Sequence, residues 1–229
     1  MRKFLLFLPT LLLTFNSFSQ VVLPLKERVS AIEDIQKDRL ENLLPKLMKR
    51  EKIDCWVIIT REYNEDPIIK SLLPPTWLNA RRRTILVFTL NESSNKVDMA
   101  AITRYSFGNL IKSVWDKEKE PNQMKALVDY LLFKNPKKIG INISKVYGIA
   151  DGLSVTDNNL LMSYLPKSLK AKVVSAEPLA VSWIETRTEK EMILFSHLTE
   201  ITHNIIKRAF STNVITPGVT TTDDVVWWM

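Results

Sequence analysis

The chain has 229 residues, of which 45% are hydrophobic and 25% are charged, and this balance is typical of a soluble globular protein. The formal net charge of +7 is spread along the chain rather than gathered into a stripe, which argues against nucleic-acid binding. Cys55 is the only cysteine, so the chain cannot build an internal disulfide framework.

The N-terminus has the parts of a secretory signal peptide. Residues 1–3 are basic, residues 4–15 are mostly apolar, and Ser17 and Ser19 place small residues where a signal peptidase reads them. We therefore expect residues 1–19 to be removed and the mature chain to be exported to the periplasm or the outside of the cell. An uncleaved anchor is the alternative, but the apolar run is shorter than the roughly 20 residues that span a membrane.

Helix and strand patterns alternate along the mature chain. The patterns predict helices over residues 35–50, 107–115, 123–133 and 157–165, and strands over residues 54–60, 84–90, 97–103, 138–143 and 171–175. Pro45 should kink the first helix, because proline lacks the N–H and clashes with the preceding turn. Turn-forming residues 91–95 make residues 84–103 a hairpin. We therefore predict an α/β fold with a mixed β-sheet and flanking helices, rather than a purely parallel sheet.

A long amphipathic helix is expected from residue 185 to residue 210. Thr188 and Glu191 have the spacing of a capping box. An apolar stripe follows on this helix, made of Leu194, Leu198, Ile201, Ile205 and Ala209. After a turn at residues 216–220, a second helix begins and the chain ends on two tryptophans and a methionine. So much apolar surface needs a packing partner, and we interpret residues 183–229 as the truncated start of a further domain.

Several kinds of active site have no counterpart in this pattern. The glycines form neither G-x-G-x-x-G nor a phosphate loop, which disfavours a nucleotide-binding domain, and no G-x-S-x-G motif marks a serine hydrolase. His197 and His203 lie six residues apart, whereas two ligands on one face of a helix lie three or four apart. Cys55 falls in an apolar strand and is interpreted as a core thiol rather than a nucleophile. We therefore assign no catalytic residue and no metal ligand to this chain.

The order of segments around residue 180 carries a family resemblance. A last strand at residues 172–175 leads through Ala-Glu-Pro-Leu to a basic-Thr-x-x-Glu helix start at Arg187, an amphipathic helix, and then Pro-Gly-Val-Thr at residues 217–220. This order is similar to the junction between the two domains of Xaa-Pro aminopeptidases and their creatinase and prolidase relatives. Upstream, residues 53–59, 84–103, 138–142 and 151–154 resemble the N-terminal domain of the same family. One departure is Trp183-Ile184, where the family often has a Leu-Arg pair.

The resemblance implies a creatinase-like N-terminal domain over residues 20–182 and the first helices of a pita-bread metallopeptidase domain over residues 183–229. It implies that the complete protein removes an N-terminal residue preceding proline, using two divalent metal ions of the manganese or zinc type. The implied ligands are two Asp, one His and two Glu; none matches a residue here, and all would follow Met229. This chain alone is therefore expected to hold no cofactor and to be inactive. Proline-containing peptides are the implied substrates, and the N-terminal domain is the implied site of homo-oligomer assembly.

Trp77 and Arg81 are the candidates for lining the mouth of a substrate site. Both lie on the loop before the hairpin, where Trp77 could close over an apolar side chain and Arg81 could bind a peptide carboxylate. The alternative is that Trp77 packs at the surface and that the run Arg81-Arg82-Arg83 is solvated or paired locally. For the chain as a whole, the alternative is a secreted, non-catalytic binding or assembly module with the same N-terminal fold.

Overall fold

A computed structural model describes residues 22–229, so the expected signal peptide at residues 1–19 lies outside the described residues. Residues 25–199 form one compact unit, which holds the whole sheet, and residues 200–229 lie outside that unit. Over the described range, no helix is both long enough and apolar enough to cross a membrane.

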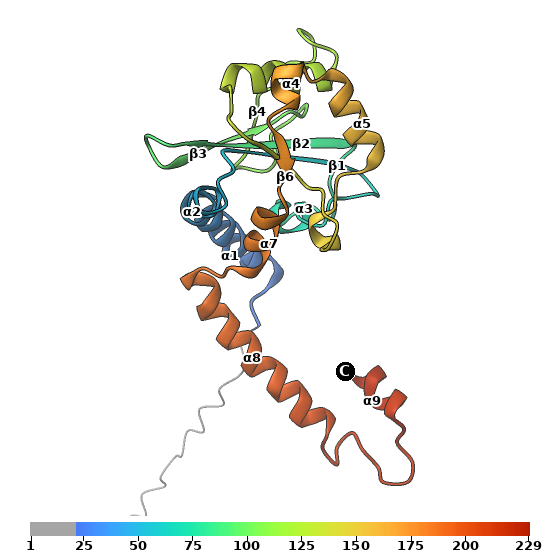
Figure 1. Ribbon diagram of the computed structural model, residues 1–229. Coiled ribbons are helices and arrows are strands. Elements are labelled where there is room, and N and C mark those ends of the chain that lie inside the picture. The colour runs from blue at the N-terminus through green and yellow to red at the C-terminus, as the bar shows by residue number, and fades with distance from the viewer. Residues whose placement is uncertain (1–21) are drawn as a thin grey trace, which may run out of the picture. The chain divides into compact units, whose positions relative to one another are not determined.

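Within the described residues, a mixed sheet of six strands forms the centre of the compact unit (Figure 1). The strands are β1 (Cys55–Arg61), β2 (Arg83–Asn91), β3 (Lys96–Ala101), β4 (Lys112–Ser113), β5 (Ile139–Ile141) and β6 (Val173–Ser175). Their order across the sheet is β4-β3-β2-β1-β5-β6. β2 is antiparallel to β1 and β3, whereas β5 is parallel to β1 and β6, and β4 is parallel to β3. The predicted α/β fold with a mixed sheet is therefore confirmed.

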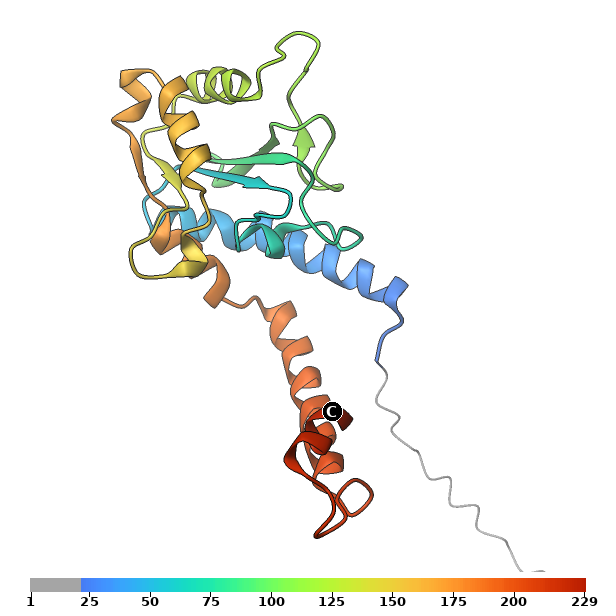
Figure 2. The same cartoon turned by 90° about the vertical axis from the view of Figure 1, so that its right-hand side faces the viewer.

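Helices cover both faces of this sheet. In chain order they are α1 (Leu25–Asp38), the π-helical turn η1 (Arg39–Leu43), α2 (Leu44–Arg50), α3 (Ile69–Leu72), α4 (Gln123–Lys134), the 3₁₀ turn η2 (Gly148–Ala150), α5 (Val155–Tyr164), α6 (Lys167–Lys170) and α7 (Glu177–Glu185). Figures 1 and 2 show α4 and α5 on one side of the sheet and α2, α3 and α7 on the other. α8 (Glu189–Ala209) and α9 (Thr222–Trp228) follow in the chain.

The central strand β1 is apolar along almost its whole length because both of its faces are buried. Trp56 and Ile58 pack into one core with η1, α2, α3 and α7, whereas Cys55, Val57 and Ile59 pack into a second core with α4, α5 and α6. None of these five side chains is more than 2% exposed. Since neighbouring side chains of a strand point to opposite faces, a strand between two helical layers needs an unbroken apolar run.

The first long helix departs from α-helical geometry just before Pro45, where we expected a kink. The turn η1 joins α1 to α2, and Pro45 lies in the first turn of α2. A π-helical turn has wider hydrogen-bond spacing, so it relieves the missing N–H of a proline inside a helix. The same turn brings Arg39 to an inward position, where it is only 6% exposed.

Arg39 fastens this turn to the end of α7. Its guanidinium donates to the backbone oxygens of Trp183 and Thr186, pairs with Glu191 at 2.7 Å, and lies 4.3 Å from the centroid of the Trp183 ring. Trp183 is buried and donates from its indole N–H to Ser71 at 2.7 Å. Trp183, at one of the two positions where the sequence departs from the resemblance, is thus a core residue that holds α7 against the rest of the unit.

Three assignments made from the sequence differ from the structure. The helix predicted over residues 35–50 begins ten residues earlier, with α1 at Leu25. Residues 107–115 form no helix; they make β4 and a tight turn in which the N–H of Phe107 donates to Ile111 at 2.8 Å. Gly108 has a φ of +64°, and a Cβ there would lie 2.9 Å from the side chain of Pro74, so the turn depends on glycine. Residues 176–179, interpreted as a linker, instead lead into α7, whose apolar face is buried in the core.

A buried carboxylate stands out near the end of β1. Asp66 is fully buried, and none of the ion pairs of the described residues includes it. It accepts hydrogen bonds from the N–H of Ile68 and from Asn142, both at 2.8 Å, and Asn142 accepts from Trp56 at 2.7 Å. A Cβ at Gly152 would lie 2.2 Å from Asp66 Cγ, so only glycine fits there. Burial raises the pKa of Asp66 to about 6, although these hydrogen bonds act to lower it.

We predict that Asp66 makes the folded state less stable as the pH rises. Because its pKa is raised in the folded state, its contribution is fully present below the unfolded pKa near 3.8 and is lost as the pH passes about 6. Relative to Asp66→Asn, the unfolding free energy of the wild type should fall by roughly 2.4 kcal/mol between pH 4 and pH 8. Urea unfolding across this range measures the difference.

The change of the unfolding free energy with pH is the quantity to compare, because Asp66→Asn also loses the hydrogen bond from Asn142 and this loss is the same at every pH. Glu118→Gln is a matched control, because Glu118 is an exposed acid. Parallel pH profiles for the wild type and Asp66→Asn would show that Asp66 does not titrate as described.

Candidate functional site

The two residues that the sequence singles out lie together. Trp77 and Arg81 belong to the loop between α3 and β2, and Arg81 Cζ lies 5.0 Å from the centroid of the Trp77 ring. The same guanidinium lies 5.8 Å from the ring of Tyr105, which meets Trp77 edge to face at 5.9 Å between centroids. The three side chains form a cluster, here called the Arg81 stack, in which one cation faces two aromatic rings.

Local contacts hold the loop that carries the Arg81 stack. The N–H of Trp77 donates to Pro74 at 2.8 Å, and the Trp77 ring meets the buried Phe107 ring edge to face at 5.3 Å. At the other end of the loop, the hydroxyl of Thr84 donates to the backbone oxygen of Arg81 at 3.1 Å. Trp77 is therefore half-buried and fixed, while the guanidinium of Arg81 stays exposed.

An arginine-lined cavity of about 640 Å³ lies beside the Arg81 stack. Its lining residues are Glu62, Asn79, Arg81, Arg82, Arg83, Thr103, Arg104, Tyr105, Trp115 and Gln123. Four of these are arginines and only Glu62 is an acid, so the walls carry a net positive charge. The Glu62 carboxylate is engaged by the backbone N–H of Arg82 at 3.0 Å. Such a concave, cationic and partly aromatic wall suits an anionic ligand.

A buried ion-pair cluster fixes one wall of this cavity. Arg61 binds Asp157 with two hydrogen bonds of 2.7 and 2.8 Å, and Arg83 Nε lies 3.1 Å from the same carboxylate. Burial of Asp157 raises its pKa, but the hydrogen bonds from Arg61 and Ser154 and the charges of Arg83 and Arg61 outweigh this, so the pKa lies below its ordinary value. Pairing therefore accounts for Arg83 of the arginine run.

The other cations of the cavity wall have no such neutralisation. Within the part of the chain that the structure describes, no ion pair joins Arg81, Arg82 or Arg104 to a carboxylate. Of the interpretations of the arginine run, local pairing holds for Arg83, whereas Arg81 and Arg82 are exposed, which agrees with a solvated strand entrance as well as with a ligand site. Arg81 and Arg82 remain available to a ligand carboxylate or phosphate.

The sequence did not single out Tyr105 or Arg104. Both follow β3, and the hairpin of β2 and β3 returns the chain to the level of Arg81. The predicted hairpin could have placed Arg104 and Tyr105 beside Arg81. The sequence does not lead to that placement, because the adjoining residues 107–115 are predicted to form a helix. The contacts of the Tyr105 ring with Trp77 and Arg81 show that it belongs to the Arg81 stack.

The walls of the cavity offer cationic and aromatic groups that can bind a ligand. Cys55 is fully buried, and burial raises the pKa of its thiol to about 12, so the prediction of a core thiol is confirmed. Among residues 22–229, no group of three or more His, Cys, Asp and Glu side chains is arranged to hold a metal ion. The residues described therefore do not supply the ligands of the metal ions that the family resemblance implies.

We predict that Asp157→Asn destabilises the fold by about 2 kcal/mol, because it leaves two partly buried arginines without their counter-charge. The figure is below that for a fully buried pair, since Arg61 and Arg83 keep 36% and 29% exposure of their side chains. Asp129→Asn is the control, because Asp129 makes an exposed pair with Lys125 and should cost less than about 0.5 kcal/mol. Equal urea midpoints for the two variants would contradict this role of Asp157.

Comparison with known proteins adds no family assignment: no protein-family model, no curated protein and no solved structure matches this chain.

Proposed function

We propose that this chain is the N-terminal part of an exported Xaa-Pro aminopeptidase-like metallopeptidase, in which the Arg81 stack receives the proline-containing peptide. The observation that carries the proposal is the placement of the Arg81 guanidinium over Trp77 and Tyr105 at the edge of the arginine-lined cavity. The complete protein would remove an N-terminal residue that precedes proline.

The chemistry of such a peptide agrees with the chemistry of this site. Proline rings pack on aromatic faces, as in the aromatic grooves that bind proline-rich segments. Trp77 and Tyr105 supply two such faces. A peptide carboxylate forms strong, charge-assisted hydrogen bonds with arginine, and Arg81 is already oriented by the two rings. One ligand could therefore use both the apolar and the cationic parts of the site.

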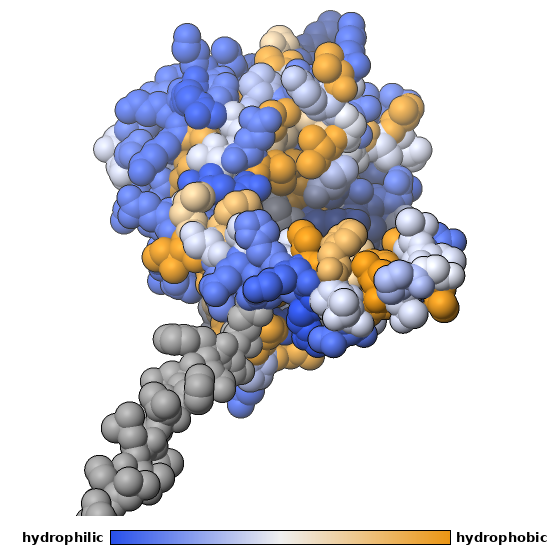
Figure 3. Space-filling view, turned by 90° about the horizontal axis from the view of Figure 1, so that it is seen from below, coloured by the Kyte–Doolittle hydropathy of each residue, from blue (hydrophilic) through white to orange (hydrophobic). Residues whose placement is uncertain are grey.

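The exposed apolar residues of α8 support the interpretation of residues 183–229 as the start of a second domain. Hydrophobic side chains reach the surface in several places on the face drawn in Figure 3. On α8, those at least 43% exposed are Met192, Ile193, Phe195, Leu198, Ile205 and Ile206. A helix with this much exposed apolar surface is typical of an element that packs against a further part of a protein.

The catalytic chemistry belongs to residues other than those described. In the proposed family, two divalent metal ions of the manganese or zinc type supply an activated water molecule. The residues described here contribute binding and positioning only, and a homo-oligomer formed through the N-terminal domain is part of the same proposal.

Binding of the tripeptide Ala-Pro-Ala tests the assigned recognition site. We predict that the purified chain binds the free acid about fivefold more tightly than the C-terminal amide, because only the acid offers Arg81 a carboxylate. Arg81→Ala should abolish this preference, and Trp77→Ala should weaken both ligands. Leu78→Ala is the control, since the neighbouring Leu78 is 98% exposed and outside the Arg81 stack. Calorimetric titration that finds equal affinities for acid and amide in the wild type would refute the site.

Reading the gene past the codon for Met229 tests the family assignment. We expect an open frame that contains two Asp, one His and two Glu in the family order, and Xaa-Pro cleavage by its product with Mn²⁺. A stop codon at that point, or a full product that cleaves no Xaa-Pro bond, would instead favour a secreted binding or assembly module. That second candidate is supported by the cavity.

A further inference from the structure

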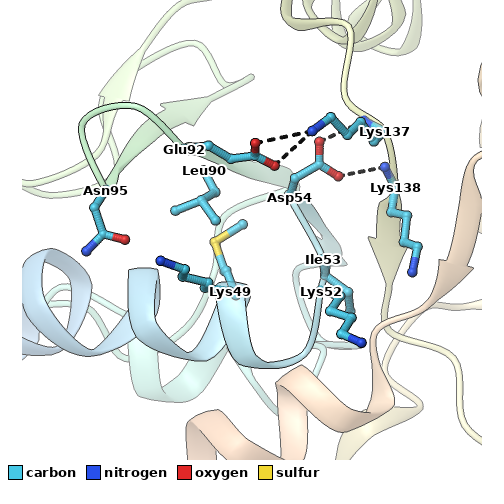
Figure 4. A pocket seen from close by; sticks show the side chains of 10 residues that line it. Lys49, Lys52, Ile53, Asp54, Leu90, Glu92, Asn95, Lys137 and Lys138 are labelled. Carbon is cyan, nitrogen blue, oxygen red and sulfur yellow. Dashed lines mark hydrogen bonds and ion pairs between the residues drawn. The ribbon is translucent and has the colours of Figure 1, made fainter.

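A second cavity, here called the lysine pocket, lies at the opposite end of the central strands from the arginine-lined cavity. It has a volume of about 470 Å³ and lies where β1 begins and β2 ends. Its lining residues are Met48, Lys49, Lys52, Ile53, Asp54, Leu90, Glu92, Asn95, Lys137 and Lys138. They come from the end of α2, from the β2–β3 hairpin and from the turn before β5, as Figure 4 shows.

The lysine pocket has an apolar floor. Met48 and Ile53 are 0% and 4% exposed and belong to the main core, and Leu90 packs against that core while keeping part of its surface exposed. Leu90 stays in place because its N–H donates to the backbone oxygen of Asp54 at 2.8 Å. Figure 4 shows Leu90, Lys49 and Asn95 around the space between the hairpin and α2. A hydrocarbon group in this space would cover the exposed part of the floor.

The rim of the lysine pocket carries more positive than negative charge. Asp54 is fully used, because its two oxygens accept the backbone N–H groups of Lys137 and Lys138 at 2.7 and 2.6 Å. Glu92 is likewise occupied, since it pairs with the ammonium of Lys137 at 3.0 Å. Both interactions are drawn in Figure 4. The pocket is lined by four lysines and two acids, so two positive charges remain in excess.

Three lysines remain on the rim. Lys49, Lys52 and Lys138 are exposed, and none of them takes part in an ion pair with another described residue. Three like charges around an apolar floor create a local positive potential that one anionic group would relieve. The lysine charges alone would suit any polyanion. The apolar floor favours a ligand that also carries a hydrocarbon group.

We propose that the lysine pocket binds a small amphiphilic carboxylate, with its hydrocarbon chain on the exposed part of Leu90 and its acid group near Lys49. This site is separate from the Arg81 stack and does not depend on the proposed peptidase function. The two cavities lie at opposite ends of β1 and share no lining residue.

Calorimetric titration of the 229-residue chain with decanoate, and with decanol as the uncharged counterpart, tests the proposal. Saturable one-to-one binding of decanoate is expected, together with weaker binding of decanol. The double variant Lys49→Glu, Lys138→Glu should weaken decanoate binding about tenfold at low salt and leave decanol unchanged. Leu90→Thr, which suits a strand, should weaken both ligands.

Lys46→Glu is the matched control, because Lys46 is an exposed lysine of the same helix that does not line the pocket. It should leave both affinities unchanged. The site would be ruled out by undetectable decanoate binding, by equal affinity for decanoate and decanol, or by equal losses in Lys46→Glu and in the double variant. Urea unfolding of each variant separates a loss of binding from a loss of folding.

Discussion

Both faces of the strand β1 are buried, and the other elements of the compact unit pack against these two faces. Trp56 anchors one core through tilted and edge-on contacts with Phe88 and Trp183, whose centroids lie 5.8 and 6.3 Å away. Its indole N–H cannot remain unpaired at that depth, and it donates to Asn142, which in turn binds Asp66. One buried aromatic residue thus requires a polar chain that joins β1, the residue after β5 and the loop before α3.

The same burial forces charge to the two ends of the central strands. Between Cys55 and Thr60, β1 carries no ionisable group except a buried thiol, whereas Asp54 precedes the strand, Arg61 ends it and Glu62 follows it. Both cavities lie at these strand ends for that reason. One is lined by Arg81 and Tyr105, and the other by the lysines that make no ion pair among the described residues. At the ends of the strands, side chains from segments distant in sequence can meet around a solvent-filled space.

Much of the fold could be predicted because strong local signals agreed with the tertiary structure. The hairpin of β2 and β3 has turn residues between two β-rich runs. The helical pattern of residues 123–133 agrees with α4, whose first turn is capped in the structure by Asn122, which accepts from the N–H groups of Met124 and Lys125. The misassigned segment 107–115 has apolar residues at helix-like spacing, but Gly108 and its close contact with Pro74 impose a turn. The short helix α7 escaped notice because its stability comes from burial of Leu179, Ala180 and Trp183 rather than from a local cap.

The sequence by itself determined the alternation of helices and strands, the hairpin within a mixed sheet and the candidates Trp77 and Arg81, because each depends on residues close together in the chain. The tertiary structure alone decided that Tyr105 joins those two residues, that Asp157 neutralises Arg83 and not Arg81, and that Lys49 and Lys138 border one pocket. These outcomes depend on which strand ends lie next to one another in the sheet. Strand order is set by packing between distant segments, which no local pattern of residues contains.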